Sequence, residues 1–404
     1  MFNDRRLLHI YAIIFLDVVV GSIIGPVLPE FVRGHTQPQL WLALGTSLFL
    51  GVQLVSAPLL GKLSDAYGRK PIFRLSALGT FLADCLLLPV RMGTYLANRL
   101  SDGLTNGLYA TVRSAITDIS PKEALFRNLG IEGAIISLGF VIGPAIAGLL
   151  ITTLNLTEPV EQARYVVMMA VVLSGLNVVL SFLLRETHPN DSAANTKGVL
   201  WADLKAALAQ SLNVGSLLAR LRQKEREHPG LLNLVLMQVA LTMAVGYYNY
   251  FVAYVSLGAM QMNATDISYF FMYFGGLSVA ISYGFYGFIA DRINQQRWIF
   301  WLAAIGAPVL ASYGLVGTSR VWLYVIVTID CFTYSLIQGL IEGLMAQKTT
   351  DNDRGEIFGL NQAMQGLASF GTTLVFGALS VIDLRLPFAW FAACLVVVAW
   401  LARK

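Results

Sequence analysis

Charged residues are scarce in this sequence. Asp, Glu, Lys and Arg together make up 13% of its 404 residues, whereas hydrophobic residues make up 56%. A soluble globular chain usually carries about 25% charged residues. The shortage of charge argues against a water-soluble fold and indicates that lipid surrounds most of the chain.

Cysteine and histidine are also rare, at three and four residues. The cysteines, Cys85, Cys331 and Cys394, fall in hydrophobic stretches and form no close pair, so they predict neither a disulfide framework nor a zinc site. The histidines lie at or beyond the ends of the apolar stretches, which leaves intramembrane proton transfer to carboxyl groups. No GxxxxGKS/T phosphate-binding loop occurs. The sequence therefore predicts no metal, no cofactor, no ATP-driven step and no enzymatic activity.

Long apolar runs take the place of the missing charge. A transmembrane helix needs roughly 20 mostly apolar residues, and these runs lack the alternating pattern of a membrane β-barrel. We predict twelve spans in two sets of six, at residues 8–32, 40–61, 71–90, 93–116, 128–153 and 164–184, then at 230–258, 267–290, 297–316, 321–346, 356–379 and 386–402. The predicted fold is an all-α membrane protein with an N-terminal bundle at 1–185, a partly helical cytoplasmic linker at 186–229 and a C-terminal bundle at 230–404.

Lysine and arginine gather in alternate loops. If the N-terminus lies inside, the outer loops hold only Arg33, Arg91, Arg164, Arg320 and Arg385. Cytoplasmic loops retain positive charge, so both termini are predicted to be cytoplasmic. This topology accounts for the net charge of +4 and removes the reason to expect a nucleic-acid partner. The basic and apolar linker suits either a helix on the inner membrane surface or a solvated connector.

The loop after the second span is rich in glycine and charge, and it begins with GKLSDAYGR at Gly61–Arg69. Gly61 and Gly68 are expected to permit a tight turn, and Asp65 can pair with a neighbouring arginine. A shorter version, GFIADR, recurs at the corresponding place in the second half and contains Asp291. The repetition indicates two related halves, as in transporters built from parallel repeats.

Several spans contain charged residues that a lipid-facing helix would exclude. Asp17 lies in the first span, Asp84 in the third, and Arg99 and Asp102 in the fourth. An ionised Asp at the bilayer centre is energetically costly, so such residues usually face a cavity and mark an ion or proton path. Asp17 is the first candidate for proton binding. Glu132, by contrast, lies close enough to a span end to be solvated.

Three patterns resemble those of a known family. The loop that begins at Gly61 is similar to the signature loop of the major facilitator superfamily. Asp17, followed by PVLP at 26–29, resembles the first-helix motif of the twelve-helix drug/proton antiporters, the tetracycline exporters among them. The fifth span resembles the antiporter motif of these exporters, with Ala147 in place of a usual glycine. The glycines and proline that carry this last likeness are Gly139, Gly143, Pro144 and Gly148.

The resemblance implies two pseudo-symmetric six-helix bundles that rock to give alternating access. It further implies that a conformational latch forms on the cytoplasmic side, and that Arg99 holds Asp17 or Asp102 ionised until a proton or a cationic substrate competes. A static ion pair between the first and fourth helices is the alternative, above all for Asp102. The predicted latch residues are Gly61, Asp65, Gly68, Arg69 and Asp291.

The tenth span departs from the tetracycline exporters because it carries Asp330 and Glu342, whereas the ninth contains no acid. Aligning the halves maps Arg113 onto Glu342, and we hypothesise that these two residues form an inter-half gate. Tyrosines of the seventh span suit either an organic substrate or an interfacial belt, and the belt is favoured for Tyr254. The predicted cavity residues are Asn106, Tyr247, Tyr250, Asp330, Tyr334, Gln338, Gln362 and Gln365.

The sequence as a whole favours a secondary transporter that exports a small amphipathic organic molecule, a drug or a metabolite, in exchange for protons. The expected setting is a bacterial cytoplasmic membrane, with the lipid bilayer as surroundings and a monomer as the functional form. An importer or facilitator of a nutrient or metabolite, siderophore-like compounds included, is the first alternative. A receptor or scaffold without transport is the second, and the intramembrane charges speak against it.

Overall fold

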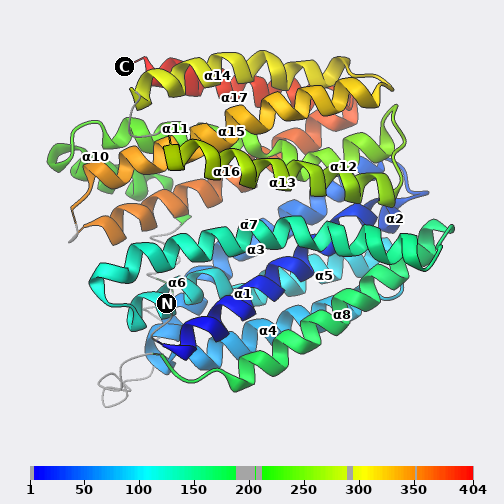
Figure 1. Cartoon of the computed structure of the whole chain (residues 1–404), viewed down its shortest axis with the longest axis horizontal. Helices are drawn as coiled ribbons and strands as arrows, with labels where there is room; N and C mark the ends of the chain where they lie inside the picture. Colours follow the sequence, from blue (N-terminus) through cyan, green and yellow to red (C-terminus); the bar gives the residue numbers. More distant parts are fainter. Residues whose placement is uncertain (1–3, 188–204, 206–211, 289–293, 351–352, 404) are drawn as a thin grey trace. The chain divides into compact units, whose positions relative to one another are not determined.

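The computed structural model describes residues 4–187, 205, 212–288, 294–350 and 353–403. Within these ranges the chain forms helices and the turns that connect them, with no β-strand (Figure 1). This is the outcome expected in lipid, where a helix satisfies its own backbone hydrogen bonds.

The packing of the helices divides the chain into two compact units. Unit 1 consists of Met1–His35, Leu48–Ala209 and Asn263–Gly275, and unit 2 consists of Thr36–Ser47, Gln210–Met262 and Gly276–Lys404. Two long helices, α3 (Pro38–Tyr67) and α13 (Ala264–Phe288), contribute residues to both units. The bundle boundaries expected at 185 and 230 stay a prediction.

Unit 1 is built around α1 (Arg5–Ile23), which packs against α6, α7 and α8 (Figure 1). Asp4 caps this helix, because its carboxylate accepts from the backbone N–H of Arg6 at 2.8 Å and satisfies a donor that the first turn leaves free. Ile10, Ile14 and Val18 on one face of α1 belong to the buried core of the unit. The remaining helices of the unit are α2 (Leu28–Val32), α4 (Arg69–Leu87), α5 (Met92–Thr105), α6 (Leu108–Ile119), α7 (Lys122–Thr153) and α8 (Pro159–Leu183), with the 3-10 turn η1 (Gly25–Val27) before α2.

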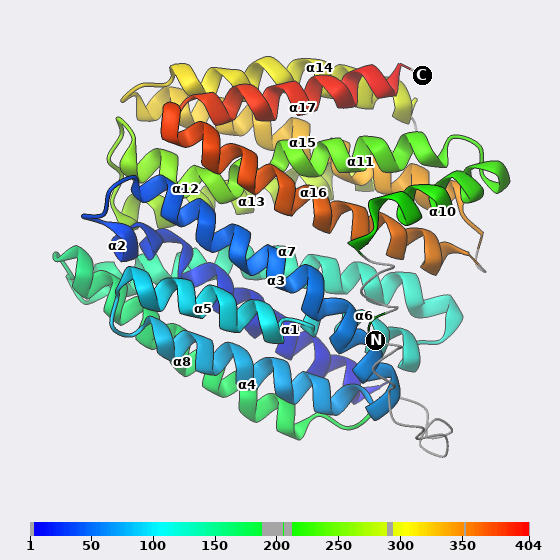
Figure 2. The ribbon, with the colours of Figure 1, turned by 180° about the vertical axis from the view of Figure 1, so that it is seen from behind.

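Unit 2 places α17 (Leu386–Ala402) against α14, α11 and α16 (Figure 2). The helix is apolar on every side, and its buried Phe388 and Phe391 lie among the aromatic rings of neighbouring segments. A helix that is hydrophobic all round belongs in a core or in a membrane. The other elements are α10 (Val214–Glu227), α11 (Leu231–Val245), α12 (Tyr247–Leu257), α14 (Gln295–Ser312), η4 (Tyr313–Leu315), α15 (Arg320–Lys348) and α16 (Arg354–Ile382).

Nine helical stretches of the described chain are long and apolar enough to cross a membrane. The other three expected spans are also helical. The third corresponds to α4, which carries more charge for its length than the nine, the fourth to the pair α5 and α6, and the twelfth to α17, which is shorter.

Three expected spans are each divided between consecutive helical segments in this structure. The first breaks at Gly25 and Pro26, the fourth at Asn106 and Gly107, and the seventh at Gly246. Proline lacks the N–H that would continue the helix. Breaks of this kind at membrane depth are typical where the backbone lines a cavity or is covered by other protein segments.

Candidate functional site

Three carboxyl groups from three helices of unit 1 lie within range of one another's charges. Asp17 on α1 and Asp84 on α4 are 8% and 3% exposed, and Asp102 on α5 is partly buried. The charges of Asp17 and Asp102 interact, and Asp84 interacts with both of them and with Arg99. The structure thus brings the four residues predicted for proton coupling into one cluster, although they come from three separate spans.

The carboxyl groups of this cluster are held by neutral donors or by none. Asp102 Oδ1 accepts from Thr80 Oγ1 at 3.1 Å. Asp84 Oδ2 is buried and has no hydrogen-bond partner among the described residues. Buried polar atoms are normally paired, so this oxygen is a position where a bound proton would relieve an unfavourable charge.

Arg99 lies beside the acids without an ion pair to any of them in the described chain. Its Nε donates to Asn98 Oδ1 at 2.7 Å, and its guanidinium carbon lies 5.6 Å and 5.8 Å from the ring centres of Phe49 and Tyr95. These distances fit cation–π contacts. The static ion pair left open by the sequence is therefore not the contact that Arg99 makes in this structure.

Arg69 lies at the centre of the loop predicted to be a latch. Its side chain is 7% exposed and contacts Asp65 Oδ1 at 2.5 Å, Asp118 Oδ2 at 2.8 Å and Ser64 Oγ at 3.1 Å. Gly68, just before it, has φ +94°, a conformation that favours glycine. The same loop contact includes Glu186, whose Oε1 accepts from the backbone N–H of Arg69 at 2.9 Å.

Two predictions about this loop have different outcomes. The tight turn expected at Gly61 is wrong, because Gly61 lies inside α3 and a Cβ there would meet nothing within 4 Å. Asp291, the corresponding acid of the second half, lies outside the described residues. The latch itself stays a prediction.

Arg113 contacts a buried acid of its own unit. Its Nε lies 3.3 Å from Glu132 Oε1, and the Glu132 side chain is 2% exposed. Glu132 is therefore not solvated as expected, because α7 packs that turn against the rest of unit 1. In unit 2, Glu342 Oε1 accepts from Gln338 Nε2 at 2.5 Å. The gate between Arg113 and Glu342 stays a prediction.

Two glycines of the antiporter-like motif, Gly139 and Gly143, lie on the surface of α7 that faces α1. A Cβ on Gly139 would lie 2.7 Å from Val18 Cγ1, and one on Gly143 would lie 2.0 Å from Ser22 Oγ and 2.8 Å from the backbone N of Ile23. Pro144 is accommodated within α7 without ending it. The close approach that small residues allow between helices thus holds the helix that carries Asp17. Gly148, one turn further, approaches Ser268 of α13.

Unit 2 contains a second buried carboxyl group. Asp330 on α15 is 2% exposed, and its Oδ2 accepts from Tyr247 Oη at 2.5 Å and from Tyr313 Oη at 3.0 Å. Tyr250 and Tyr254 donate instead to backbone carbonyls, at 2.7 Å to Leu384 and at 2.5 Å to Tyr313. The interfacial belt favoured for Tyr254 is therefore wrong, because the residue is buried in the helix packing.

The other predicted cavity residues divide between the two units. Asn106 accepts from Gln53 Nε2 at 3.0 Å in unit 1. In unit 2, Gln238 donates to Gln338 at 2.9 Å. Sequence reasoning missed both Gln53 and Gln238, although an amide in an apolar span was the signal that could have found them. Of the remaining residues, Tyr334 lies against Tyr248 with ring centres 5.8 Å apart, Gln365 accepts from Thr242 at 3.3 Å, and Gln362 is exposed.

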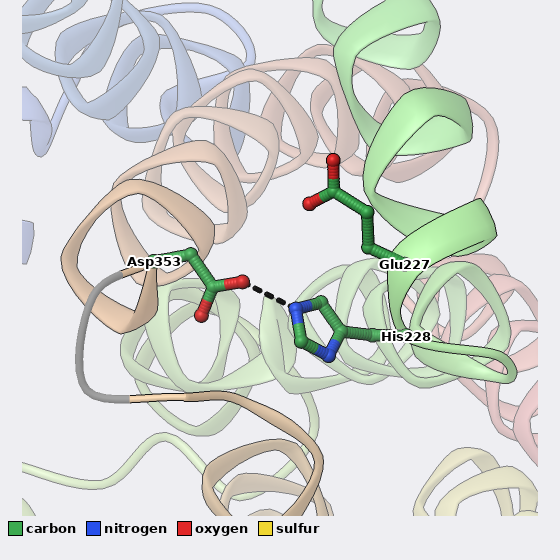
Figure 3. Close-up of side chains that lie close together, drawn as sticks. All are labelled: Glu227, His228 and Asp353. Carbon is green, nitrogen blue, oxygen red and sulfur yellow. Dashed lines mark hydrogen bonds and ion pairs between the residues drawn. The ribbon is translucent and has the colours of Figure 1, made fainter.

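The end of α10 is tied to the start of α16 by charged groups (Figure 3). The imidazole of His228 is directed at the carboxylate of Asp353, with which it forms a close contact, and Glu227 projects from the preceding position. The ligand atoms of these three residues lie within 4.8 Å of one another. Each of the three has a protein partner: His228 and Asp353 contact each other, and Lys224 Nζ lies 3.0 Å from Glu227. Lys224 Nζ also lies 3.4 Å from Glu356 at the start of α16. We interpret the cluster as an ion-pair network.

Comparisons with known proteins agree with this architecture. The sequence model of the Major Facilitator Superfamily matches residues 10–373. Tetracycline resistance protein, class E, of Escherichia coli is 33% identical over 190 residues, which cover 46% of this chain and 45% of that protein. Multidrug resistance protein 2 of Bacillus subtilis is 22% identical over 408 residues, covering 98% of this chain and 94% of that protein.

A solved structure extends the likeness to the whole fold. The crystal structure of the human organic anion transporter MFSD10 covers 100% of both chains with a TM-score of 0.70, at 19% sequence identity. That identity carries the fold alone. Together with the match of the family's sequence model over most of the chain, it confirms the predicted twelve-helix fold class, and the chain belongs to the major facilitator superfamily, whose members are transporters and not enzymes.

Proposed function

We propose that this transporter exports a small amphipathic organic molecule, a drug or a metabolite, in exchange for protons. The observation that carries the proposal is the cluster of Asp17, Asp84 and Asp102 beside Arg99 in unit 1. The proposed setting is a bacterial cytoplasmic membrane with both termini on the inner side, and the proposed functional form is a monomer.

The charge of this cluster favours the binding of protons. Three ionised carboxylates and one guanidinium would sum to a net charge of −2 in a buried place, and both burial and like charges disfavour the ionised forms. Proton uptake by one or more carboxyls reduces this charge. A cationic or hydrogen-bonding substrate that approaches the same acids competes with the proton, which is the coupling an exchanger needs.

Asp17 is the most suitable coupling residue because of its position. It lies on α1 next to Val18, which packs against Gly139 of α7, and it precedes the break at Gly25 in the same span. In the proposed cycle, Asp17 takes up a proton from the outside, substrate leaves, and release of the proton inside allows the next substrate to bind. A change of charge at Asp17 would therefore act on a helix that packs closely against α7 and ends just before Gly25.

The direction of transport rests on the relatives. The names of the two bacterial relatives are those of resistance proteins against tetracycline and against multiple drugs, and the glycine-rich face of α7 is similar to the motif of exporters. Import or facilitated diffusion of a nutrient or metabolite is the second candidate, because likeness to solved structures carries the fold and not the direction.

The test is gradient-driven uptake into liposomes that contain the purified protein and have an acidic lumen. The probes are tetracycline and a panel of cationic, zwitterionic and anionic amphipathic compounds. We expect at least one probe to accumulate, and Asp17→Asn to abolish this accumulation while the protein remains folded. Asp266→Asn, an acid in the first turn of α13 outside the cluster, is the matched control and should retain transport.

Facilitated diffusion would give a different result. The probe would then equilibrate down its own gradient at the same rate with or without the pH gradient, and Asp17→Asn would leave that rate unchanged. This outcome would replace proton exchange by the second candidate function.

A further inference from the structure

Asp330 has no cationic neighbour in the described part of unit 2. The groups that face it are the phenols of Tyr247 and Tyr248 on α12, Tyr313 of η4 and Tyr334, with the thiol of Cys331 beside it. The arginines and lysines of α14, α15 and α16 lie in the first or last turns of these helices. A permanently ionised Asp330 would therefore be an uncompensated charge in the core, which is energetically costly.

The two hydrogen-bond partners of Asp330 can serve both of its protonation states. Tyr247 and Tyr313 carry hydroxyl groups, and a hydroxyl donates to a carboxylate or accepts from a carboxylic acid. A guanidinium is a cation and can only donate, so it favours the carboxylate over the acid. Asp118 and Glu132 each contact an arginine. Among the described residues Asp330 contacts hydroxyl groups instead, which accommodate both of its forms.

Both hydroxyl donors lie at interruptions of a helix. Tyr247 is the first residue of α12, directly after the break at Gly246, and Tyr313 is the first residue of η4, directly after α14 ends. A change in the hydrogen bonds of Asp330 would therefore act at places where the backbone is not held by a continuous helical ladder.

We propose that Asp330 is a second proton-binding carboxyl group, which alternates between an acid and a carboxylate and moves the breaks at Tyr247 and Tyr313 as it does so. This proposal deepens the proposed proton exchange, because it adds a proton site in unit 2 to the cluster in unit 1. It also assigns Asp330 to the coupling ion rather than to the wall of a substrate cavity.

The direct test is pH-difference infrared spectroscopy of the full chain in liposomes, which records the C=O stretch of a protonated carboxyl group. We expect one such band to disappear in Asp330→Asn while a different band disappears in Asp17→Asn. Tyr313→Phe should keep the Asp330 band and move its midpoint upward by about one pH unit, because a donor to the ionised form is lost. Tyr250→Phe, whose hydroxyl bonds to a backbone carbonyl, should leave the midpoint unchanged.

The proposal is overturned if Asp330→Asn has the same carboxyl bands as the unmodified protein, or if Tyr313→Phe leaves every midpoint in place. Tyr313→Phe also covers the case in which Asp330→Asn fails to fold. The infrared spectrum requires no substrate, so it tests the Asp330 proposal independently of the transport assay. Either proposal, proton binding at Asp330 or proton exchange at Asp17, can therefore be contradicted while the other is supported.

Discussion

The acids of this chain differ in the kind of partner that holds them. Asp118 and Glu132 contact arginines. Within the described residues, Asp102 and Asp330 accept hydrogen bonds from hydroxyl groups, and Asp84 has a buried oxygen without a donor. An arginine favours the carboxylate over the acid, whereas a hydroxyl can donate to a carboxylate or accept from an acid. The distinction separates the acids that stabilise the fold from those that are chemically suited to proton exchange.

Asp353 provides a pH-dependent contact outside the membrane spans. Hydrogen bonds from Thr350 and, to a smaller extent, from His228 lower the pKa of this carboxyl from 3.8 to about 2. A carboxyl whose pKa is lower in the folded state stabilises that state above its unfolded pKa and ceases to do so as the pH falls to the folded value. The hydrogen bonds of Asp353 with Thr350 and His228 should therefore be complete above a pH of about 4 and weaken toward a pH of about 2.

The corresponding variant is Asp353→Asn, with a spin label at the exposed position Gln223 of α10 as the probe. We expect the label to be more mobile in the variant than in the unmodified protein at neutral pH. Acid should increase the mobility of the label in the unmodified protein but not in the variant. Asp383→Asn, at the opposite end of α16, is the control and should resemble the unmodified protein. Equal mobility in all three proteins would show that Asp353 does not hold α10.

At the scale of single residues, the sequence identified charges in apolar spans but not their partners. Asp17, Asp84, Arg99 and Asp102 were predictable because a charge within a span must avoid lipid. The pairing of Arg113 with Glu132 was not, because the sequence does not show which turns of a helix end are covered by a neighbour. Tyr254 was misplaced for a related reason, since a tyrosine at a span end can face the interface or a backbone carbonyl equally well.

At the scale of helices, the packing of α1 on α7 depends on glycine at positions 139 and 143. A methyl group at Gly143 would meet backbone atoms of α1 at 2.8 Å, whereas one at Gly133 on the same helix would meet nothing within 4 Å. Backbone cannot move aside as a flexible side chain can. Gly143 and Gly133 therefore provide a matched pair for testing the contact.

We expect Gly143→Ala to lower the thermal unfolding midpoint of the detergent-solubilised protein, because the clash costs about 1–3 kcal/mol. Gly133→Ala should leave the midpoint unchanged or raise it, since alanine favours a helix by up to about 1 kcal/mol over glycine. The difference between the two variants is the informative quantity. Equal midpoints would mean that α1 does not approach α7 as closely as the structure indicates.

The hydrophobic pattern of the sequence predicted where the helices lie but not where they are interrupted. The hydrophobic runs placed the helices, and Pro26 was a visible reason for the first interruption. Gly107, at the second interruption, lies in close tertiary packing, because a Cβ there would lie 2.6 Å from Leu60 Cβ, and no pattern within the span carries that information. In the sequence, Gly246 could not be distinguished from the glycines that lie within uninterrupted helices.

At the scale of the whole molecule, composition and repetition were sufficient for the fold class. Twelve apolar runs in two sets and a repeated charged loop indicated a helical membrane protein of two related halves, and the solved relative has that fold. The superfamily was suggested by the resemblance of the loop that begins at Gly61, and the family's sequence model confirms it. Substrate identity was not predictable, because it depends on side chains that line a cavity and not on the pattern of the spans. The assignment of Asp330 needed the structure, since only the fold shows that tyrosines and no cation of the described chain surround it.

The most direct measurement of the central claim is the proton flux that a substrate gradient drives in liposomes without an initial pH gradient. Tetracycline placed on one side, or the best compound of the panel, should move protons in the direction opposite to its own, and the flux should vanish in Asp17→Asn. Protons that move in the same direction as the compound, or a compound flux without any proton flux, would contradict proton-coupled exchange.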